Sequence, residues 1–301
     1  MRLATVRRAA GTPQARTQAT VLDVDGRHHL LPAAGVEAVL ALPAWQETAR
    51  RALDEAPLGS DRSAEQFTLA PVVINPGKVI CCGLNFADHI TEMGRDLPEY
   101  PTLFAKYADT LIGANDEILA PPAAQQALDW EAELAVVVGA TLVRADRDTA
   151  ALAIAGYTIA NDVSMRDWQH RTLQWFQGKA WDASTPVGPF LVTPDEVDPV
   201  AGLTLRCTVD GQVRQESTTR ELVFDAPSLL AYISSFTALR IGDLVLLGTP
   251  GGVGSAAKPP TYLRDGSRML TEIENLGRLD NTVRFLPVDE TSSAPTALHT
   301  A

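Results

Sequence analysis

The chain of 301 residues is poor in cysteine, and its three cysteines make no disulfide framework. Cys81 and Cys82 are adjacent, and a strand would place them on opposite faces; Cys207 is far away in the sequence. We therefore interpret all three as small buried hydrophobic residues in a reducing compartment.

The sequence also lacks membrane segments and any excess of positive charge. No stretch reaches the roughly 18 uninterrupted apolar residues of a membrane span, and residues 1–16 carry arginines but no apolar signal core. Lys and Arg number 25 against 37 Asp and Glu, a net charge of −12. A nucleic-acid binder needs a basic face to replace the counterions of phosphate. We expect a cytoplasmic protein with neither nucleic acid nor membrane as a partner.

Several common catalytic motifs are missing. The Gly-x-Ser-x-Gly pattern of many serine hydrolases does not occur. The glycine-rich run at residues 247–254 follows a strand-like segment, but it lacks the Walker spacing and predicts a tight turn. The histidines form no zinc constellation. Serine-hydrolase, nucleotide-binding and zinc chemistry are therefore disfavoured.

The patterns along the sequence divide the chain into three parts. Residues 1–75 are expected to form a small amino-terminal domain, with a hairpin of 21–24 and 27–31 and a helix over 45–54. Residues 76–286 are expected to form a β-rich domain, and the Ser/Thr/Ala-rich residues 287–301 a disordered tail. The patterns in the large domain predict strands at 79–82, 134–138, 203–209, 244–247 and 269–273 and helices at 145–155 and 228–239.

The segment 128–139 combines three acidic residues with the pattern of a buried strand. If it forms one strand, alternation places Asp129, Glu131 and Glu133 on one face, with no basic residue interleaved. Carboxylates that enter a core cost several kcal/mol unless a cation neutralises them. Two interpretations stay open here: a hard divalent cation such as Mg²⁺, Mn²⁺ or Ca²⁺, or an acidic strand end in solvent.

Polar residues also follow a second apolar strand, which ends at Asn161-Asp162. Asp162 either supplies a further carboxylate or caps a following helix. Arg166 and Gln169 lie one helical turn apart beyond it. Lys179 follows in a tryptophan-rich stretch, where it either acts chemically or packs its stem at the surface.

A third candidate is a histidine with a nearby carboxylate. If residues 85–93 are helical, His89 and Glu92 are i,i+3 neighbours, so Glu92 can orient the imidazole and raise its basicity. Such a pair can remove a proton from water, although many pairs at this spacing are only surface partners.

Taken in order, these segments resemble the fumarylacetoacetate hydrolase family over about residues 78–285. The resemblance is carried by Gly83-Leu84-Asn85-Phe86-Ala87-Asp88-His89 with Glu92, the acidic strand at 129–139, the segment 156–169, Gly178-Lys179 with Gly188-Pro189, and Gly242-Asp243 followed by Gly248-Thr249-Pro250. It implies an α+β, β-rich fold: a mixed β-sandwich or β-roll with a small amino-terminal domain. It also implies a homodimer.

The resemblance assigns roles to individual residues. It implies a Mg²⁺ or Mn²⁺ ion, with Ca²⁺ as another occupant, on Glu131, Glu133 and Asp162. His89 and Glu92 would sit on a lid and activate water, and Lys179 would stabilise developing negative charge, assisted by Arg166 and Gln169. Thr249 would line the substrate site.

The resulting expectation is a divalent-metal-dependent hydrolase that cleaves a carbon–carbon bond in a short 2,4-dioxo acid of the acylpyruvate or fumarylpyruvate type. The alternatives on the same scaffold are an oxaloacetate-type decarboxylase and a 2-hydroxyhepta-2,4-diene-1,7-dioate-type isomerase. A non-catalytic binding protein is a third. Phe86 and Leu247, where many relatives have tyrosine and threonine, leave the dicarbonyl acid substrate open.

Overall fold

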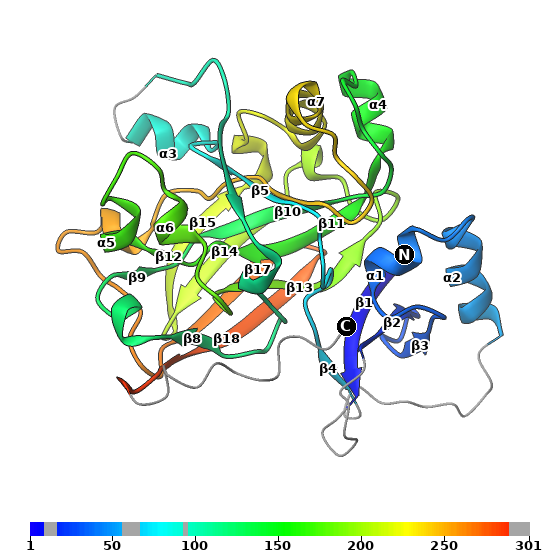
Figure 1. The fold of residues 1–301 in the computed structure, drawn as a ribbon, viewed down its shortest axis with the longest axis horizontal. Coiled ribbons are helices and arrows are strands. Elements are labelled where there is room, and N and C mark those ends of the chain that lie inside the picture. The colour runs from blue at the N-terminus through cyan, green and yellow to red at the C-terminus, as the bar shows by residue number, and fades with distance from the viewer. Residues whose placement is uncertain (9–16, 56–66, 93–95, 289–301) are drawn as a thin grey trace.

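The computed structural model describes residues 1–8, 17–55, 67–92 and 96–288, except for the side chains of His89, Thr91 and Glu92. Within these ranges the protein is rich in strands, with few and short helices, and its sheets are mixed (Figure 1). The β-rich fold expected from the sequence is thereby confirmed. No helix among the described residues is long and apolar enough to cross a membrane.

The largest sheet carries most of the described strands. Its neighbouring strands are mainly antiparallel, with parallel pairs at β16–β5 and β13–β7. In spatial order it contains β3 (His28–Leu30), β2 (Thr17–Leu22), β1 (Arg2–Arg8), β13 (Thr185–Val192), β11 (Ile154–Asn161), β10 (Ala132–Val138), β16 (Leu244–Leu246), β5 (Val79–Gly83) and β6 (Thr102–Lys106), with β4 (Phe67–Leu69) beside β1 and β7 (Leu111–Ile112) beside β13.

Two smaller sheets complete the strand structure. The five-stranded sheet runs β15 (Gln212–Thr218), β14 (Thr204–Val209), β17 (Arg268–Ile273), β18 (Gly277–Phe285) and β8 (Ile118–Ala120). The third sheet pairs β12 (Ser164–Met165) with β9 (Leu128–Asp129). This small sheet lies next to the acidic segment, so it helps to shape the site described below.

Strand β10 is central and is buried on both faces. Leu134 and Val136 contribute to a core that also contains Leu205 and Met269 of the five-stranded sheet. Ala135, on the opposite face, belongs to a second core. This is the period-2 alternation of a strand, and it confirms the buried strand predicted over 134–138.

The amino-terminal strands continue the large sheet rather than forming a sheet of their own. Arg2 and Leu3 of β1 pair with Val192 and Leu191 of β13. The predicted hairpin is present as β2 and β3, and Asp23 closes its turn by accepting the backbone N–H groups of residues 25 and 27. The division into domains at residue 75 stays a prediction.

The helices are α1 (Val36–Leu40), α2 (Trp45–Asp54), α3 (Ala87–Glu92), α4 (Arg147–Leu152), α5 (Arg166–Gln169), α6 (Phe176–Lys179) and α7 (Ala226–Phe236). Helix α2 has the predicted bounds. Helices α4 and α7 both end before their predicted ranges do. Asp146 and Asp225 cap their amino termini, so α4 begins two residues later than predicted and α7 two residues earlier. In Figure 1, α5 and α6 lie at the opposite end of the molecule from α1 and α2.

Candidate active site

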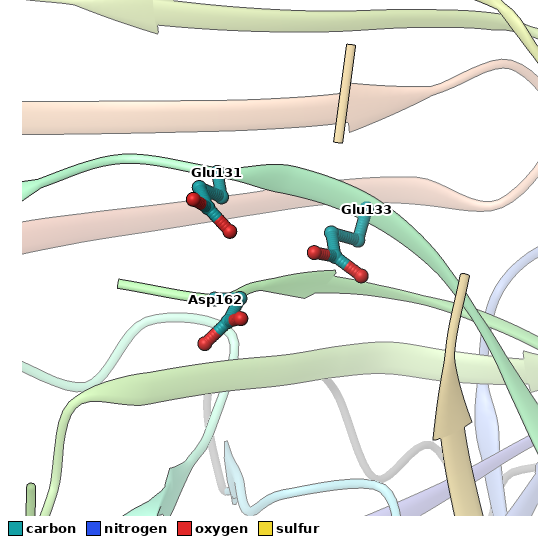
Figure 2. Close-up of side chains that lie close together, drawn as sticks. All are labelled: Glu131, Glu133 and Asp162. Atoms are coloured by element: carbon teal, nitrogen blue, oxygen red, sulfur yellow. The ribbon is translucent and has the colours of Figure 1, made fainter. Parts of the chain in front are cut away.

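Three carboxylates meet where β10 and β11 run side by side. The register pairs Ala132 with Asn161, so Glu131 and Glu133 lie beside Asp162 at the end of β11. Oxygen atoms of these three residues all lie within 4.8 Å of one another (Figure 2). The Asp162 N–H also donates to the Glu131 carbonyl at 2.8 Å, which holds the two segments together. Asp162 therefore supplies a third carboxylate and does not cap a helix.

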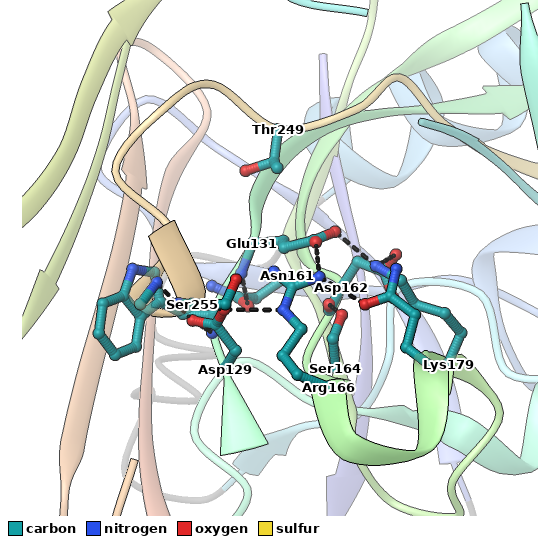
Figure 3. Close-up of polar contacts among 12 residues, drawn as sticks. Asp129, Glu131, Asn161, Asp162, Ser164, Arg166, Lys179, Thr249 and Ser255 are labelled. Atoms are coloured by element: carbon teal, nitrogen blue, oxygen red, sulfur yellow. Dashed lines mark hydrogen bonds and ion pairs between the residues drawn. The ribbon is translucent and has the colours of Figure 1, made fainter. Parts of the chain in front are cut away.

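Two buried lysines neutralise part of this negative charge. Lys179 places its Nζ atom 2.6 Å from Oε2 of Glu131 and 2.8 Å from Oδ2 of Asp162 (Figure 3). Lys106, at the end of β6, places its Nζ atom 2.5 Å from Oδ1 of Asp162. Burial opposes ionisation of Asp162, but the two lysines lower its pKa overall, and Asp162 and Glu131 raise the pKa of Lys179 against its own burial.

Glu133 is the carboxylate of the three that forms no ion pair with a cation among the described residues. Its Oε2 atom accepts the N–H of Gly248 at 2.7 Å. Burial, together with the charges of Asp162 and Glu131, raises the pKa of Glu133 well above its ordinary value. A divalent cation would relieve this repulsion, and carboxylate oxygens are the ligands that hard cations prefer. The donor set thus fits a metal ion on Glu131, Glu133 and Asp162.

Asp129 does not join this group, which corrects the expectation of one acidic strand face. The strand breaks after Asp129: β9 ends there and β10 begins at Ala132. No basic residue is interleaved in the segment itself, but Arg166 of helix α5 lies between Asp129 and Glu131. Its Nε atom is 2.8 Å from Asp129 and its Nη1 atom 2.7 Å from Glu131.

Arg166 and Gln169 share helix α5 and touch each other. Nη1 of Arg166 donates to Oε1 of Gln169 at 2.8 Å, as the i,i+3 spacing predicts. The Nη2 atom of Arg166 is buried, and the described residues offer it no hydrogen-bond partner. A buried guanidinium N–H without a partner is costly, so this atom is a donor available to an anionic ligand.

These groups line one pocket with a volume of about 330 Å³. Thr249 lies on its wall; its hydroxyl donates to the Ala132 carbonyl and accepts from Gln215. The pocket brings together most of the residues expected from the sequence: Glu131, Glu133, Arg166, Gln169, Lys179 and Thr249, alongside apolar walls from Leu84, Phe104, Trp175 and Val253. Asp162 is fully buried beside Glu131.

The histidine–glutamate pair is described only by its backbone. His89 and Glu92 belong to α3, which confirms that this segment is helical. Their side chains lie outside the described residues, so the pairing of the imidazole with the carboxylate stays a prediction.

The sequence patterns did not indicate that Lys106 belongs to the site, or that Asp129 contacts Arg166 and a loop instead of the other carboxylates. Lys106 ends the short strand β6, where a single lysine after an apolar run gives no sign of burial. Both side chains are almost completely buried. Their roles depend on partners distant in the sequence, at positions 162 and 254–255.

Comparison with known proteins gives consistent matches. The family model for the fumarylacetoacetate (FAA) hydrolase C-terminal domain matches residues 78–284. Oxaloacetate tautomerase FAHD2A, mitochondrial, of Bos taurus is 41% identical over 265 residues, which cover 87% of this chain and 83% of the relative. The human protein of the same name is 43% identical over 237 residues, covering 78% of this chain and 74% of the relative.

Solved structures agree with this match. A fumarylacetoacetate hydrolase from the psychrophilic Exiguobacterium antarcticum has a TM-score of 0.82 and 31% identity, covering 95% of this chain and all of the other. A 5-carboxymethyl-2-hydroxymuconate delta-isomerase from Mycobacterium smegmatis has a TM-score of 0.75 at 31% identity and the same coverage. With the mixed-sheet fold and the acidic cluster, these matches show that the chain belongs to the fumarylacetoacetate hydrolase family.

Proposed function

We propose that this protein is a divalent-metal-dependent enzyme that interconverts the keto and enol forms of a short 2-oxo dicarboxylic acid of the oxaloacetate type. The observation that carries the proposal is the unpartnered Nη2 atom of Arg166 in the same pocket as Lys179 and the acidic cluster. Such a pocket offers a donor for a carboxylate next to groups that stabilise an enolate.

The three carboxylates Glu131, Glu133 and Asp162 would hold the metal ion, with Mg²⁺ or Mn²⁺ as the proposed occupant. When bound, the ion supplies positive charge that orients a 2-oxo acid and stabilises its enolate.

The chain's own residues supply the remaining steps. Arg166 binds the substrate carboxylate through Nη2. Gln169 keeps the guanidinium in place by accepting a hydrogen bond from Nη1. The Lys179 ammonium donates a hydrogen bond to the developing enolate oxygen. His89, oriented by Glu92, takes the proton from carbon 3 of the keto form and delivers it to the oxygen on carbon 2, which gives the enol; the reverse transfer restores the keto form. Thr249 lines the pocket beside the substrate.

The names of the relatives support a proton-transfer reaction. Both mammalian proteins compared above are named oxaloacetate tautomerases. The structural neighbour from Mycobacterium smegmatis is named an isomerase. Tautomerisation and isomerisation both move protons without adding water, and both benefit from groups that stabilise an enolate.

Hydrolysis of a carbon–carbon bond in a 2,4-dioxo acid is the second candidate. The similarity to the Exiguobacterium fumarylacetoacetate hydrolase favours it. Here His89 would deprotonate water rather than carbon, and the expelled enolate would again meet Lys179. The two candidates therefore differ in the atom from which His89 takes its proton.

The test measures both reactions with one enzyme preparation. Oxaloacetate in D₂O reports tautomerisation through deuterium uptake at carbon 3, followed by NMR, and an acylpyruvate reports hydrolysis through pyruvate release. We expect Mg²⁺- or Mn²⁺-dependent exchange on oxaloacetate that a chelator abolishes and either ion restores. Pyruvate release from the acylpyruvate without catalysed exchange would favour the hydrolase. Full exchange activity in demetallated protein would contradict the metal-dependent mechanism.

A further inference from the structure

We propose that Asp129 is a positioning residue that aims Arg166 at the substrate and fixes the glycine-rich loop forming one wall of the pocket. This inference rests on the proposed function, because it assigns Arg166 to a substrate carboxylate. It adds a role for an acidic residue that lies outside the metal cluster and for the part of the loop at residues 252–256.

Both carboxylate oxygens of Asp129 are fully used by donors. Oδ1 accepts the N–H groups of Trp130 at 2.9 Å and Gly254 at 2.7 Å. Oδ2 accepts the N–H of Ser255 at 2.9 Å and the Nε–H of Arg166 at 2.8 Å (Figure 3). With four donors and no exposure to solvent, this carboxylate is committed to holding its neighbours.

The contact between Asp129 and the loop requires glycine at position 254. A Cβ atom at Gly254 would lie 2.7 Å from Oδ1 of Asp129 and 2.0 Å from the Thr261 carbonyl. The backbone can therefore approach Asp129 only where the side chain is absent. Trp130 adds a second tie, since its Nε1–H donates to the Gly252 carbonyl at 3.0 Å.

The loop held in this way forms part of the pocket. Val253, Ser255 and Ala256 line it, and the last two belong to the short 3₁₀ helix η6 (Gly254–Ala256). Asp129 thus binds the amides at the start of η6 and keeps this wall at a fixed distance from α5.

On the other side, Asp129 determines the orientation of Arg166. A guanidinium is planar, so fixing two of its nitrogens fixes the direction of the third. Asp129 holds Nε, while Glu131 and Gln169 hold Nη1. The remaining nitrogen, Nη2, is the one without a partner among the described residues. Without the hydrogen bond at Nε, the guanidinium could rotate, and Nη2 would no longer point toward the substrate carboxylate.

The test uses Asp129→Asn, which keeps the size of the side chain. An amide has one accepting oxygen and one donating nitrogen, so Nδ2 of the new side chain would face an N–H donor of Ser255 or Arg166. We expect KM for oxaloacetate to rise about 10- to 100-fold, as when a residue that supports a ligand is lost, with a smaller change in kcat. Binding of oxalate, an unreactive 1,2-dicarboxylate, should weaken by a similar factor in calorimetry with Mg²⁺ present.

A matched control comes from Asp243, which is also fully buried. It accepts the N–H groups of Lys78 and Arg240 and pairs with the Lys78 ammonium, but it does not line the pocket. Asp243→Asn should lower the melting temperature and leave the oxalate Kd and the KM unchanged. A general loss of stability alone would affect both variants in the same way.

Hydrogen exchange gives a readout independent of turnover. In Asp129→Asn the amides of Gly254 and Ser255 should exchange faster, while Asp243→Asn should leave them as in the wild type. If the amides of Gly254 and Ser255 exchange at the wild-type rate in Asp129→Asn, or if this variant keeps the wild-type Kd for oxalate, the positioning role is overturned. A wild-type protein that binds oxalate yet catalyses no tautomerisation would instead contradict the proposed function and leave this inference standing.

Discussion

Lys179 illustrates how one side chain acquires a chemical role from its surroundings. The sequence left open whether its stem packs at the surface among tryptophans. In the structure it is 2% exposed, and its ammonium contacts Glu131 and Asp162. Burial disfavours the charged form, but the two carboxylates outweigh it and raise the pKa of Lys179, so the ammonium stays protonated. A permanent cation is what an enolate requires.

We therefore predict that Lys179→Met lowers kcat for oxaloacetate exchange by about 10²–10³-fold. The substitution also removes the ammonium that Glu131 and Asp162 share, while Arg166 and Lys106 still pair with them. Unfolding free energy in the metal-free protein should therefore fall, but by less than the about 3–5 kcal/mol of a buried charge left with no partner. Stopped-flow or NMR kinetics and urea unfolding measure the two effects. Lys258→Met, at an exposed lysine, is the control and should change neither. A variant that loses stability but keeps its turnover would support a purely structural lysine.

At the scale of elements, the hairpin of β2 and β3 carries a buried histidine away from the pocket. His28 is 9% exposed, and its Nδ1 atom lies 2.9 Å from the Thr20 hydroxyl. Burial, and to a smaller extent the charge of His29, lower the pKa of His28 below its ordinary value of 6.5. The folded hairpin therefore favours the neutral ring.

This shift has a definite sign for stability. As the pH falls below about 6.5, His28 takes up a proton in the unfolded chain before it does so in the folded chain. Protonation therefore favours the unfolded chain, and the free energy of unfolding decreases. We predict that His28→Asn, which keeps a group able to bond to Thr20, reduces the fall in unfolding free energy between pH 7 and pH 5. Urea titrations at both pH values measure the difference, and His170→Asn, at an exposed histidine, serves as the control. Equal pH dependence in wild type and His28→Asn would contradict the prediction.

For the whole molecule, the amino-terminal elements share a core with the large sheet. This core joins Leu3 and Val36 to Val79, Leu191 and Leu244. Together with the pairing of β1 to β13, it couples residues 1–8 and 17–55 to the strands that carry the pocket. The homodimer stays a prediction at this scale.

We predict one cooperative unfolding transition by calorimetry, because neither part can unfold without exposing this shared core. Leu3→Ala, at a fully buried position, should lower the melting temperature of that single transition, with a loss of about 2–5 kcal/mol. Leu152→Ala, at an exposed leucine, should leave it unchanged. Two separate transitions, of which Leu3→Ala shifts only one, would show that the amino-terminal part unfolds independently.

The local features of this protein could be predicted from the residue pattern alone. The continuous apolar run of β10, the bounds of α2 and the one-turn spacing of Arg166 and Gln169 all depend on neighbours within a few positions, and each was predicted correctly. The family motifs added the grouping of Glu131, Glu133 and Asp162, which local patterns left undecided.

The pairing of the charges, in contrast, became apparent only from the three-dimensional fold. Asp129 was expected beside the other carboxylates, yet a break in the strand turns it toward Arg166 and the amides of residues 254–255. Lys106 reaches Asp162 from a strand 56 positions away in the sequence. A charge pair depends on distance in space and on burial, and neither is encoded in the spacing of residues along the chain.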